Sequence, residues 1–226
     1  MPVSISRRMF VLALPFVAAG CTTTQKVSAI KPGKREVPQY YRDMYAAVAD
    51  DAFPIPAPDL TKIDPQYYRQ EVAYQGPEPS GTIVIDTPKR FLYLVLGEGR
   101  ALRYGVGVGK AGLAFEGSGV IQYKREWPRW TPTQDMIARE PERYGPLAGG
   151  MEPGPTNPLG ARALYLFKNG VDTLYRSHGT NEDWSIGRSI SSGCIRLLNQ
   201  DIIDLHRRVQ NGTRVVVLQQ DNVPAA

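Results

Sequence analysis

Between residues 81 and 218 the hydrophobic positions fall into short runs that are rich in β-branched and aromatic side chains. Such runs, when bounded by turn-forming residues, predict β-strands rather than helices. The runs cover residues 82–86, 91–96, 101–106, 163–167 and 214–218. Because only a few turn-forming residues separate the first three runs, we expect those strands to form a meander of hairpins. The pattern predicts a mostly β domain.

Two segments of this region follow a helical pattern and interrupt the strands. A short helix is expected near residues 133–139 and a clearer one over residues 200–209. One face of the second helix carries Ile202, Leu205, His206 and Val209. Asn199 is placed to cap the start of this helix, and Asn211-Gly212 is typical of its end.

A stretch rich in Gly, Pro and Trp lies between Gly109 and Gly160. It contains Trp127-Pro-Arg-Trp130 and Pro153-Gly-Pro-Thr-Asn-Pro158. A long segment of this composition inside a folded domain is typical of functional loops. We therefore expect an ordered loop over a site.

The first 21 residues have the organisation of an export signal. Arg7-Arg8 precedes an apolar stretch from Met9 to Ala19, which is shorter than the roughly 20 residues that span a bilayer. The two arginines are similar to a twin-arginine export motif, although an ordinary basic segment has the same pattern. Ala18-Ala19-Gly20-Cys21 resembles a bacterial lipobox, in which Cys21 is lipidated. The alternative is a cysteine that happens to follow a cleavage site.

The chain divides into three segments by composition. Residues 1–21 are the expected export signal, with its twin-arginine motif and lipobox. Residues 22–79 are expected to form a tether and a packed extension, with a helical pattern over residues 40–49 and a Pro-rich run at 54–58. Residues 80–219 hold the predicted strands and are expected to form the main domain.

Composition and charge exclude several classes of protein. The chain has 226 residues, 42% of them hydrophobic, which fits one folded domain and not a large multidomain enzyme. Its 27 basic and 22 acidic residues give a net charge of +5, which falls to +3 without the export signal. The basic residues are scattered, so we expect no nucleic-acid binding. Two Cys and two His are too few for a Cys/His zinc site, and no metal or cofactor is expected.

Cys194 has the sequence neighbours of a reactive thiol. It lies in Ser191-Ser192-Gly193-Cys194-Ile195-Arg196, where polar groups, backbone amides and a cation can stabilise a thiolate. The alternative, an inert half-buried cysteine, is equally open from composition alone. Because a thiol is mostly protonated at neutral pH, a nucleophile here needs a neighbouring base, most often an imidazole.

The chain offers two imidazoles, and His178 is the better candidate for the base. His206 lies on the apolar face of the last predicted helix, where a packed histidine is the expected interpretation. His178 ends a strand-like run and precedes Gly179-Thr180-Asn181, so it lies where a strand opens into a loop. Fifteen residues separate it from Cys194, enough for the chain to return and bring the two side chains within hydrogen-bond distance.

His178-Gly179-Thr180-Asn181, followed by Ser191-Ser192-Gly193-Cys194-Ile195-Arg196, resembles the signature of the L,D-transpeptidases with a YkuD-like catalytic domain, bacterial enzymes that remodel peptidoglycan. The resemblance covers about residues 82–218, including Asn157-Pro-Leu-Gly160 and the last predicted strand. It implies an L,D-transpeptidase-type β-sandwich with a few short helices, in which residues 80–219 are the catalytic domain. It implies no cofactor.

The resemblance also implies a mechanism. Cys194 attacks the amide before the terminal D-alanine of a peptidoglycan tetrapeptide stem, and a thioester forms as D-alanine leaves. His178 is the general base and then the acid, and the main-chain carbonyl of Gly179 orients its ring. Backbone amides near Gly193 and Cys194 hold the oxyanion. Arg196 is expected to bind a stem carboxylate, or else to form a structural ion pair.

Further residues are candidates for lining the substrate groove. They are Ser191, Ser192, Gly193, Tyr175, Trp127, Trp130 and Trp184. The two serines can equally be turn formers, and aromatic side chains more often belong to the core.

The acceptor that resolves the thioester stays open. A diaminopimelate amine gives a 3-3 cross-link, a lysine attaches a lipoprotein, and a free D-amino acid is exchanged. Water would make the enzyme a cysteine L,D-carboxypeptidase or endopeptidase. A non-catalytic wall-binding module is a third interpretation, for which Cys194 and His178 have no use. The expected partners are peptidoglycan stem peptides, with a lipoprotein as one acceptor.

The expected location is the periplasm, with a lipid on Cys21 anchoring the chain to a membrane. Thr22 is not the aspartate usually associated with inner-membrane retention, so the outer membrane is the expected membrane. If Cys21 carries lipid, Cys194 has no disulfide partner in an oxidising compartment, and chemistry explains its retention. A Cys21–Cys194 disulfide is the alternative, and it would block the nucleophile.

Overall fold

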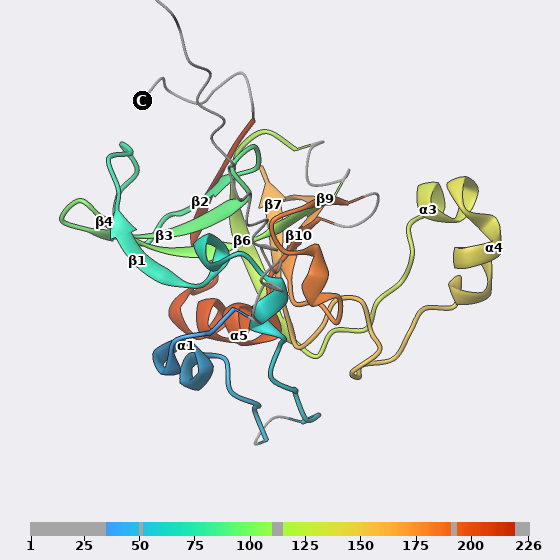
Figure 1. The fold of residues 1–226 in the computed structure, drawn as a ribbon. Helices are drawn as coiled ribbons and strands as arrows, with labels where there is room; N and C mark the ends of the chain where they lie inside the picture. Colours follow the sequence, from blue (N-terminus) through green and yellow to red (C-terminus); the bar gives the residue numbers. More distant parts are fainter. Residues whose placement is uncertain (1–34, 50–51, 110–114, 191–193, 220–226) are drawn as a thin grey trace, which may run out of the picture. The chain divides into compact units, whose positions relative to one another are not determined.

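The computed structural model describes residues 35–49, 52–109, 115–190 and 194–219, which form a mostly β fold with a few short helices, as predicted (Figure 1). Cys21, Ser191, Ser192 and Gly193 lie outside the described residues, as does the predicted export signal. The strands are β1 (Gln70–Ala73), β2 (Ile83–Asp86), β3 (Phe91–Gly97), β4 (Arg100–Gly105), β5 (Gly107–Gly109), β6 (Gly117–Glu126), β7 (Arg162–Lys168), β8 (Val171–His178), β9 (Ser189–Ile190), β10 (Ile195–Arg196) and β11 (Arg214–Leu218). The α-helices are α1 (Gln39–Met44), α3 (Gln134–Arg139), α4 (Pro141–Tyr144) and α5 (Asn199–Arg208), and the 3-10 helices are η1 (Leu60–Lys62), η2 (Pro65–Tyr67), η3 (Gly145–Leu147) and η4 (Asp183–Ser185).

Within the described residues no helix combines the length and the apolar character that crossing a bilayer requires.

The strands form one sheet in the order β1-β4-β3-β2-β11-β6-β7-β8-β10-β5-β9. The predicted meander is confirmed, because β2, β3 and β4 are consecutive antiparallel neighbours with Leu94 opposite both Ile83 and Leu102. Val106 alone separates β4 from β5, although these strands are second and tenth in the sheet order. The sheet therefore curls until both of its ends contribute to one core, as the two layers of a sandwich do.

Helix α5 packs its apolar face against this core. Ile202, Leu205 and Val209 are buried in the same cluster as strand residues from both ends of the sheet. The helix predicted over residues 200–209 is confirmed to within one residue at each end. His206 is half-buried at the side of this face, and its main-chain carbonyl accepts a hydrogen bond from Lys124 Nζ at 2.7 Å.

Two expectations about local structure are wrong. The helix predicted near residues 133–139 is confirmed as α3. The rest of the stretch from Gly109 to Gly160 is nevertheless not one long loop, because it contains α4 and the ten-residue strand β6. Glycine masks the strand pattern there, yet Gly119 is required, since a Cβ would lie 2.5 Å from the carbonyl oxygen of Phe167 in β7. Asn199 does not cap α5, because it is the first helical residue and its amide is bound elsewhere.

The extension joins the main sheet and α5. Its last strand, β1, pairs antiparallel with β4, and its helix α1 ends at Met44, earlier than the helical pattern over residues 40–49 suggests. Tyr45 is buried; its hydroxyl donates to Asp201 Oδ2 at 3.1 Å and accepts the N–H of Arg69 at 2.6 Å. These contacts hold the extension on α5, and Figure 1 shows α1 (blue) beside α5 (red).

Candidate active site

The parallel pairing of β8 with β10 brings the two sequence motifs side by side. Ile195 lies opposite Ser177, and Arg196 lies opposite His178. Cys194 immediately precedes β10, two positions before the residue that faces His178. Two residues that are sixteen positions apart in sequence are thereby placed on neighbouring segments.

His178 is buried, with 3% of its surface exposed, and its ring is oriented by the next residue. Nδ1 lies 2.6 Å from the carbonyl oxygen of Gly179, and since a carbonyl can only accept, Nδ1 carries the proton and Nε2 is the basic nitrogen. Burial lowers the pKa of His178 to about 4; the charges of Arg196 and Arg176 add to this effect, and the Gly179 hydrogen bond opposes it. At neutral pH the imidazole is therefore uncharged and can accept a proton.

The Cys194 thiol is also buried, and the backbone of β8 holds it. Its Sγ donates to the carbonyl of Leu174 at 3.3 Å. Burial raises the pKa of the thiol, while the backbone N–H of Arg176 and the charges of Arg176 and Arg196 oppose that rise. In the part of the chain that the structure describes, no hydrogen bond joins this sulfur to His178. The thiol–imidazole pairing expected from the sequence stays a prediction.

Asn199 clamps the loop that follows β8. Its Oδ1 accepts the N–H of Ala161 at 2.9 Å, and its Nδ2 donates to the carbonyl of Thr180 at 2.9 Å. Two glycines leave room for this amide, since a Cβ on Gly179 would lie 2.2 Å from Oδ1 and one on Gly160 would lie 2.3 Å from it. An asparagine before a helix predicts a cap, which is why this clamp could not be recognised from the sequence.

Arg196 is buried and forms an ion pair with Glu182. The N–H of Glu182 donates to Thr180 Oγ1 at 3.0 Å, so the ion pair braces the loop that follows β8. Of the two roles considered for Arg196, this contact is the structural one, and binding of a substrate carboxylate stays a prediction. Glu182 was not singled out from the sequence, because nothing in its neighbours indicates which cation it would meet.

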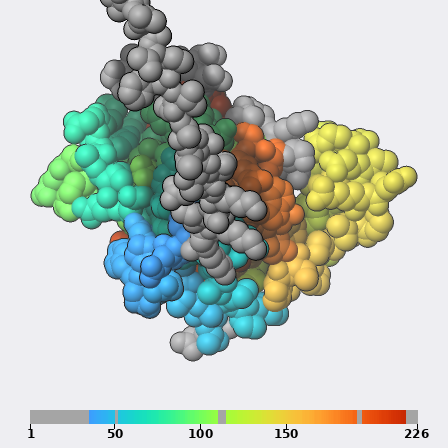
Figure 2. All heavy atoms as spheres, viewed as in Figure 1, coloured from blue at the N-terminus to red at the C-terminus, as the bar shows by residue number. Residues whose placement is uncertain are grey.

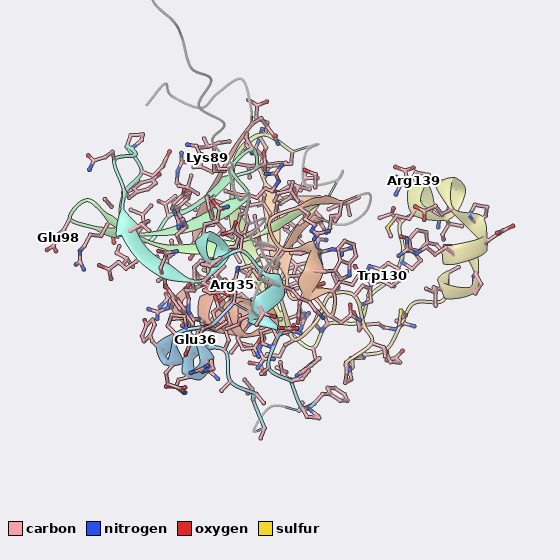
Figure 3. All side chains as sticks on the ribbon, in the orientation of Figure 1. Arg35, Glu36, Lys89, Glu98, Trp130 and Arg139 are labelled. Carbon is pink, nitrogen blue, oxygen red and sulfur yellow. The ribbon has the colours of Figure 1, made fainter. Side chains whose placement is uncertain are left out.

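A cavity of about 220 Å³ borders the imidazole. One wall belongs to the segment between β6 and β7, residues 127–161, which we call the hood. The hood contributes Trp130, Met136, Arg143, Tyr144, Leu147 and Met151, and the opposite wall includes His178, Asn181, Glu182 and Arg196. Figure 1 shows the hood helices α3 and α4 in yellow at the right, Figure 2 shows the same region as yellow spheres, and Figure 3 labels Trp130 where the hood meets the strands. Part of the stretch expected to cover a site thus borders the candidate base.

A larger cavity, of about 660 Å³, lies in the extension and is separate from this site. It is lined by residues 35–37, Arg42, Tyr45 and residues 57–61, and Figure 3 labels Arg35 and Glu36 there. None of the candidate catalytic residues borders it. Of these two cavities, the smaller one is the one that a candidate catalytic residue, His178, borders.

The aromatic groove candidates occupy different surroundings. Trp130 lines the cavity beside the imidazole. Tyr175 is 2% exposed and packs on Phe115 as part of the core. Trp127 is buried in a cluster with the extension, and Trp184 is half exposed. Among the described aromatic candidates, Trp130 alone borders this cavity.

The curated proteins to which this chain is similar include two that are described as probable L,D-transpeptidases. The Escherichia coli K12 protein described as "Probable L,D-transpeptidase YbiS" is 33% identical over 142 residues, which cover 62% of this chain and 45% of that protein. The E. coli K12 protein described as "Probable L,D-transpeptidase ErfK/SrfK" is 35% identical over 141 residues, 61% of this chain and 44% of that protein. The chain thus spans about half the length of the curated relatives it matches.

Among solved structures, a Brucella melitensis protein described as a "Probable carnitine operon oxidoreductase caia" is 53% identical, and the alignment covers 71% of this chain and 99% of that one. Its TM-score is 0.49, so the likeness adds nothing to the assignment, and the description concerns that protein alone. The model of the YkuD family, the L,D-transpeptidase catalytic domain, matches residues 80–217, which is more than half of the chain. The chain therefore belongs to the YkuD family of L,D-transpeptidase catalytic domains.

Proposed function

We propose that the chain is a cysteine-dependent L,D-transpeptidase that acts on peptidoglycan tetrapeptide stems, with residues 80–219 as its catalytic domain. Cys194 is the nucleophile, His178 is the general base and acid, and the Gly179 carbonyl orients the imidazole. The pairing of β8 with β10 carries this proposal, because it sets the strand that ends in His178 beside the segment that contains Cys194. Family membership and the hydrogen bond from Nδ1 to Gly179 support it.

The reaction begins when the Cys194 thiol leaves the Leu174 carbonyl and turns toward Nε2 of His178. Nε2 takes the S–H proton as the sulfur bonds to the carbonyl carbon that precedes the terminal D-alanine. When the C–N bond breaks, His178 returns the proton to the departing amine, and a thioester remains. The first step needs an uncharged imidazole, and the lowered pKa of His178 supplies one.

An acceptor then attacks the thioester and releases Cys194. We favour an amine, either that of a diaminopimelate side chain, which gives a 3-3 cross-link, or a lysine, which attaches a lipoprotein. Arg143 of the hood borders the cavity beside His178, and its cation suits the carboxylates that stem peptides carry. Attack by water would give a carboxypeptidase or endopeptidase instead.

We place this reaction in the periplasm, with residues 1–21 as the export signal and a lipid on Cys21 as the anchor. The basic, apolar and small-residue order of that segment supports the proposal. Fractionation of cells that express the chain, with Cys21→Ser as the comparison, tests it. The wild-type chain should stay with membranes and Cys21→Ser should be released, and a wild-type chain found free of membranes would contradict the anchor.

Incubating the purified chain with a disaccharide-tetrapeptide and weighing the products tests the reaction. A cross-linked dimer with free D-alanine is expected, whereas tripeptide and D-alanine without dimer would indicate hydrolysis. Cys194→Ala and His178→Ala should give neither product while keeping the wild-type circular dichroism spectrum. A carbapenem should add its mass to the wild-type chain and not to Cys194→Ala. An active Cys194→Ala variant would overturn the proposed nucleophile.

A further inference from the structure

Strand β8 contains a bulge beside the candidate nucleophile. Arg176 lies opposite Tyr165 of β7 and Asp172 lies opposite Phe167, so three β8 residues face one β7 residue between these pairs. Leu174, in the middle of the bulge, has φ of 58° and is 62% exposed. A leucine in the left-handed region is uncommon and persists only where the surrounding structure holds it.

An ion pair across the base of the bulge provides that support. Arg176 Nη1 and Nη2 donate to the two carboxylate oxygens of Asp172, each at 2.7 Å. Asp172 Oδ1 also accepts the N–H of Leu174 at 2.8 Å, which closes a tight turn at the left-handed residue. The guanidinium of Arg176 lies 4.4 Å from the ring centre of Tyr165 on the neighbouring strand. Both members of the ion pair are therefore held in place, Asp172 by the N–H of Leu174 and Arg176 by the ring of Tyr165.

The bulge acts on the Cys194 sulfur through a backbone carbonyl and through the charges of Asp172 and Arg176. The Leu174 carbonyl accepts the Cys194 S–H, a contact that exists only for the protonated thiol. The titratable and charged groups that act on the sulfur are Asp172, Tyr175 and Arg176 from β8 and Arg196 from β10. Tyr175 is buried and uncharged at neutral pH. A positive charge near a thiol favours its thiolate and a negative charge opposes it, so Arg176 and Asp172 act in opposite directions.

We propose that Asp172 and Arg176 are a positioning pair for Cys194: their ion pair fixes the bulge whose Leu174 carbonyl holds the resting thiol, and their opposite charges act on the sulfur in opposite directions. The inference rests on the proposed role of Cys194 as nucleophile. Neither member of the pair lines the cavity beside His178. Both act through the sulfur, Arg176 by favouring the thiolate and Asp172 by limiting it.

A purely structural role and this positioning role have different consequences. Arg176→Gln and Asp172→Asn both break the ion pair, so a pair that only braces the fold would move the reactivity of Cys194 in one direction or not at all. If the charges act on the sulfur, the two variants move it in opposite directions. Asp172→Asn keeps an oxygen for the N–H of Leu174, so the turn at the bulge is retained.

The experiment is the pH dependence of Cys194 alkylation in the full chain. The thiol loses its proton to solvent, and the thiolate then attacks iodoacetamide, forming a C–S bond as the C–I bond breaks and iodide leaves. Peptide mapping by mass spectrometry reads Cys194 separately from Cys21. Arg125→Gln is the matched control, because it removes another arginine that lies over a tyrosine ring, that of Tyr123 in β6, and Arg125 is not among the groups that act on the sulfur.

We expect Arg176→Gln to raise the alkylation midpoint by about one pH unit, Asp172→Asn to lower it, and Arg125→Gln to leave it unchanged. Shifts of the pair variants in the same direction, or unchanged midpoints, overturn the proposal. If Arg176→Gln does not fold, Asp172→Asn decides alone, since a lowered midpoint supports the pair and any other result overturns it. Alkylation needs no stem peptide. A chain that shows the expected alkylation midpoints but makes no cross-linked muropeptide dimer would therefore refute the proposed transpeptidase activity. The proposal of the positioning pair would still stand.

Discussion

Asn199 and Thr180 are joined by a 2.9 Å hydrogen bond from the side-chain amide of one to the main-chain carbonyl of the other. The oxygen of the same amide accepts the N–H of Ala161, so two loops and the start of α5 converge on one side chain. Thr180 directly follows Gly179, whose carbonyl orients the imidazole of His178. Asn199 therefore supports the loop that fixes the candidate base.

Asn199→Ala should weaken both the fold and the reaction. It leaves the Thr180 carbonyl and the Ala161 N–H without this partner, which should lower the free energy of unfolding by about 1–3 kcal/mol. Acylation by a carbapenem should also slow, because the loop that orients His178 loses its support. Urea denaturation measures the first effect and the acylation rate the second. A destabilised variant with an unchanged acylation rate would show that the loop keeps its geometry without Asn199.

Gly179→Ala should cause damage that Gly149→Ala does not. A Cβ on residue 179 would lie 2.2 Å from Asn199 Oδ1 and 3.1 Å from the Ala161 nitrogen, so the clamp has to shift. A Cβ on residue 149 would meet nothing within 4 Å, which makes that variant a matched control. We expect Gly179→Ala to lose most of its transpeptidase activity and to melt at a lower temperature. Similar behaviour of the two variants would contradict the steric argument.

Carbapenem acylation should fall on acidification with a midpoint near the pKa of His178. That pKa is about 4, so the imidazole is uncharged above this pH and protonated below it, and only the uncharged ring can take the thiol proton. An ordinary histidine would give a midpoint of about 6.5. The acylation rate measured from about pH 3 to pH 8 checks this, with circular dichroism to exclude unfolding. A midpoint near the ordinary value would mean that burial does not govern the base.

Tyr45→Phe should destabilise the chain by about 1–3 kcal/mol, because the buried Asp201 carboxyl and the partly buried Arg69 N–H lose the same partner. The hydroxyl donates to Asp201 and accepts the N–H of Arg69, and the ring stays packed when only the oxygen is removed. Chemical denaturation gives the free energy. Tyr40→Phe serves as the control, since Tyr40 is 67% exposed. Equal effects of the two substitutions would argue against the buried contact.

Asp201 should make stability fall as the pH rises toward neutral. Burial raises the pKa of Asp201 from 3.8 to about 7, so between these values the folded chain keeps a proton that the unfolded chain releases. The resulting stabilisation is complete below the unfolded pKa and is lost as pH rises through the folded one. Asp201→Asn removes this dependence. The unfolding free energy of Asp201→Asn minus that of the wild type should therefore rise from about pH 5 to about pH 7. Burial lowers the pKa of both His178 and His206, and because these groups contribute equally to the two proteins, they cancel in the difference. A difference that does not change with pH would contradict the assignment to Asp201.

The main strands could be predicted from the sequence, and the shortest ones could not. A run such as residues 91–96 is hydrophobic throughout because both of its faces are covered, and that composition is legible without a structure. Strands β9 and β10 have two residues each and exist only through pairing with distant segments. Strand β6 combines glycine with charged residues, and one of its glycines, Gly119, reflects the close approach of β7, which no local pattern reveals.

For the candidate site, residue type indicated Cys194 and His178, but their contacts depend on tertiary structure. The thiol donates to the carbonyl of Leu174, which lies in a bulge that the contacts between Asp172 and Arg176 span. Asp172 and Arg176 are four positions apart in sequence. An ion pair at that spacing is typical of a helix, so it could not be predicted for residues of a strand. Glu182 forms an ion pair with Arg196 only because the loop after β8 turns back. The presence of an arginine in a sequence motif does not show which acidic residue will pair with it.

The hood leaves the sheet and returns to it at adjacent points. Glu126 faces Arg162 across β6 and β7, and the N–H of Trp127 donates to the Ala161 carbonyl at 2.7 Å. An insertion whose two ends meet in this way can be shortened, extended or exchanged with little effect on the pairing of the strands that flank it. Evolution or an engineer can therefore remodel one wall of the cavity while the strand that ends in His178 keeps its partners.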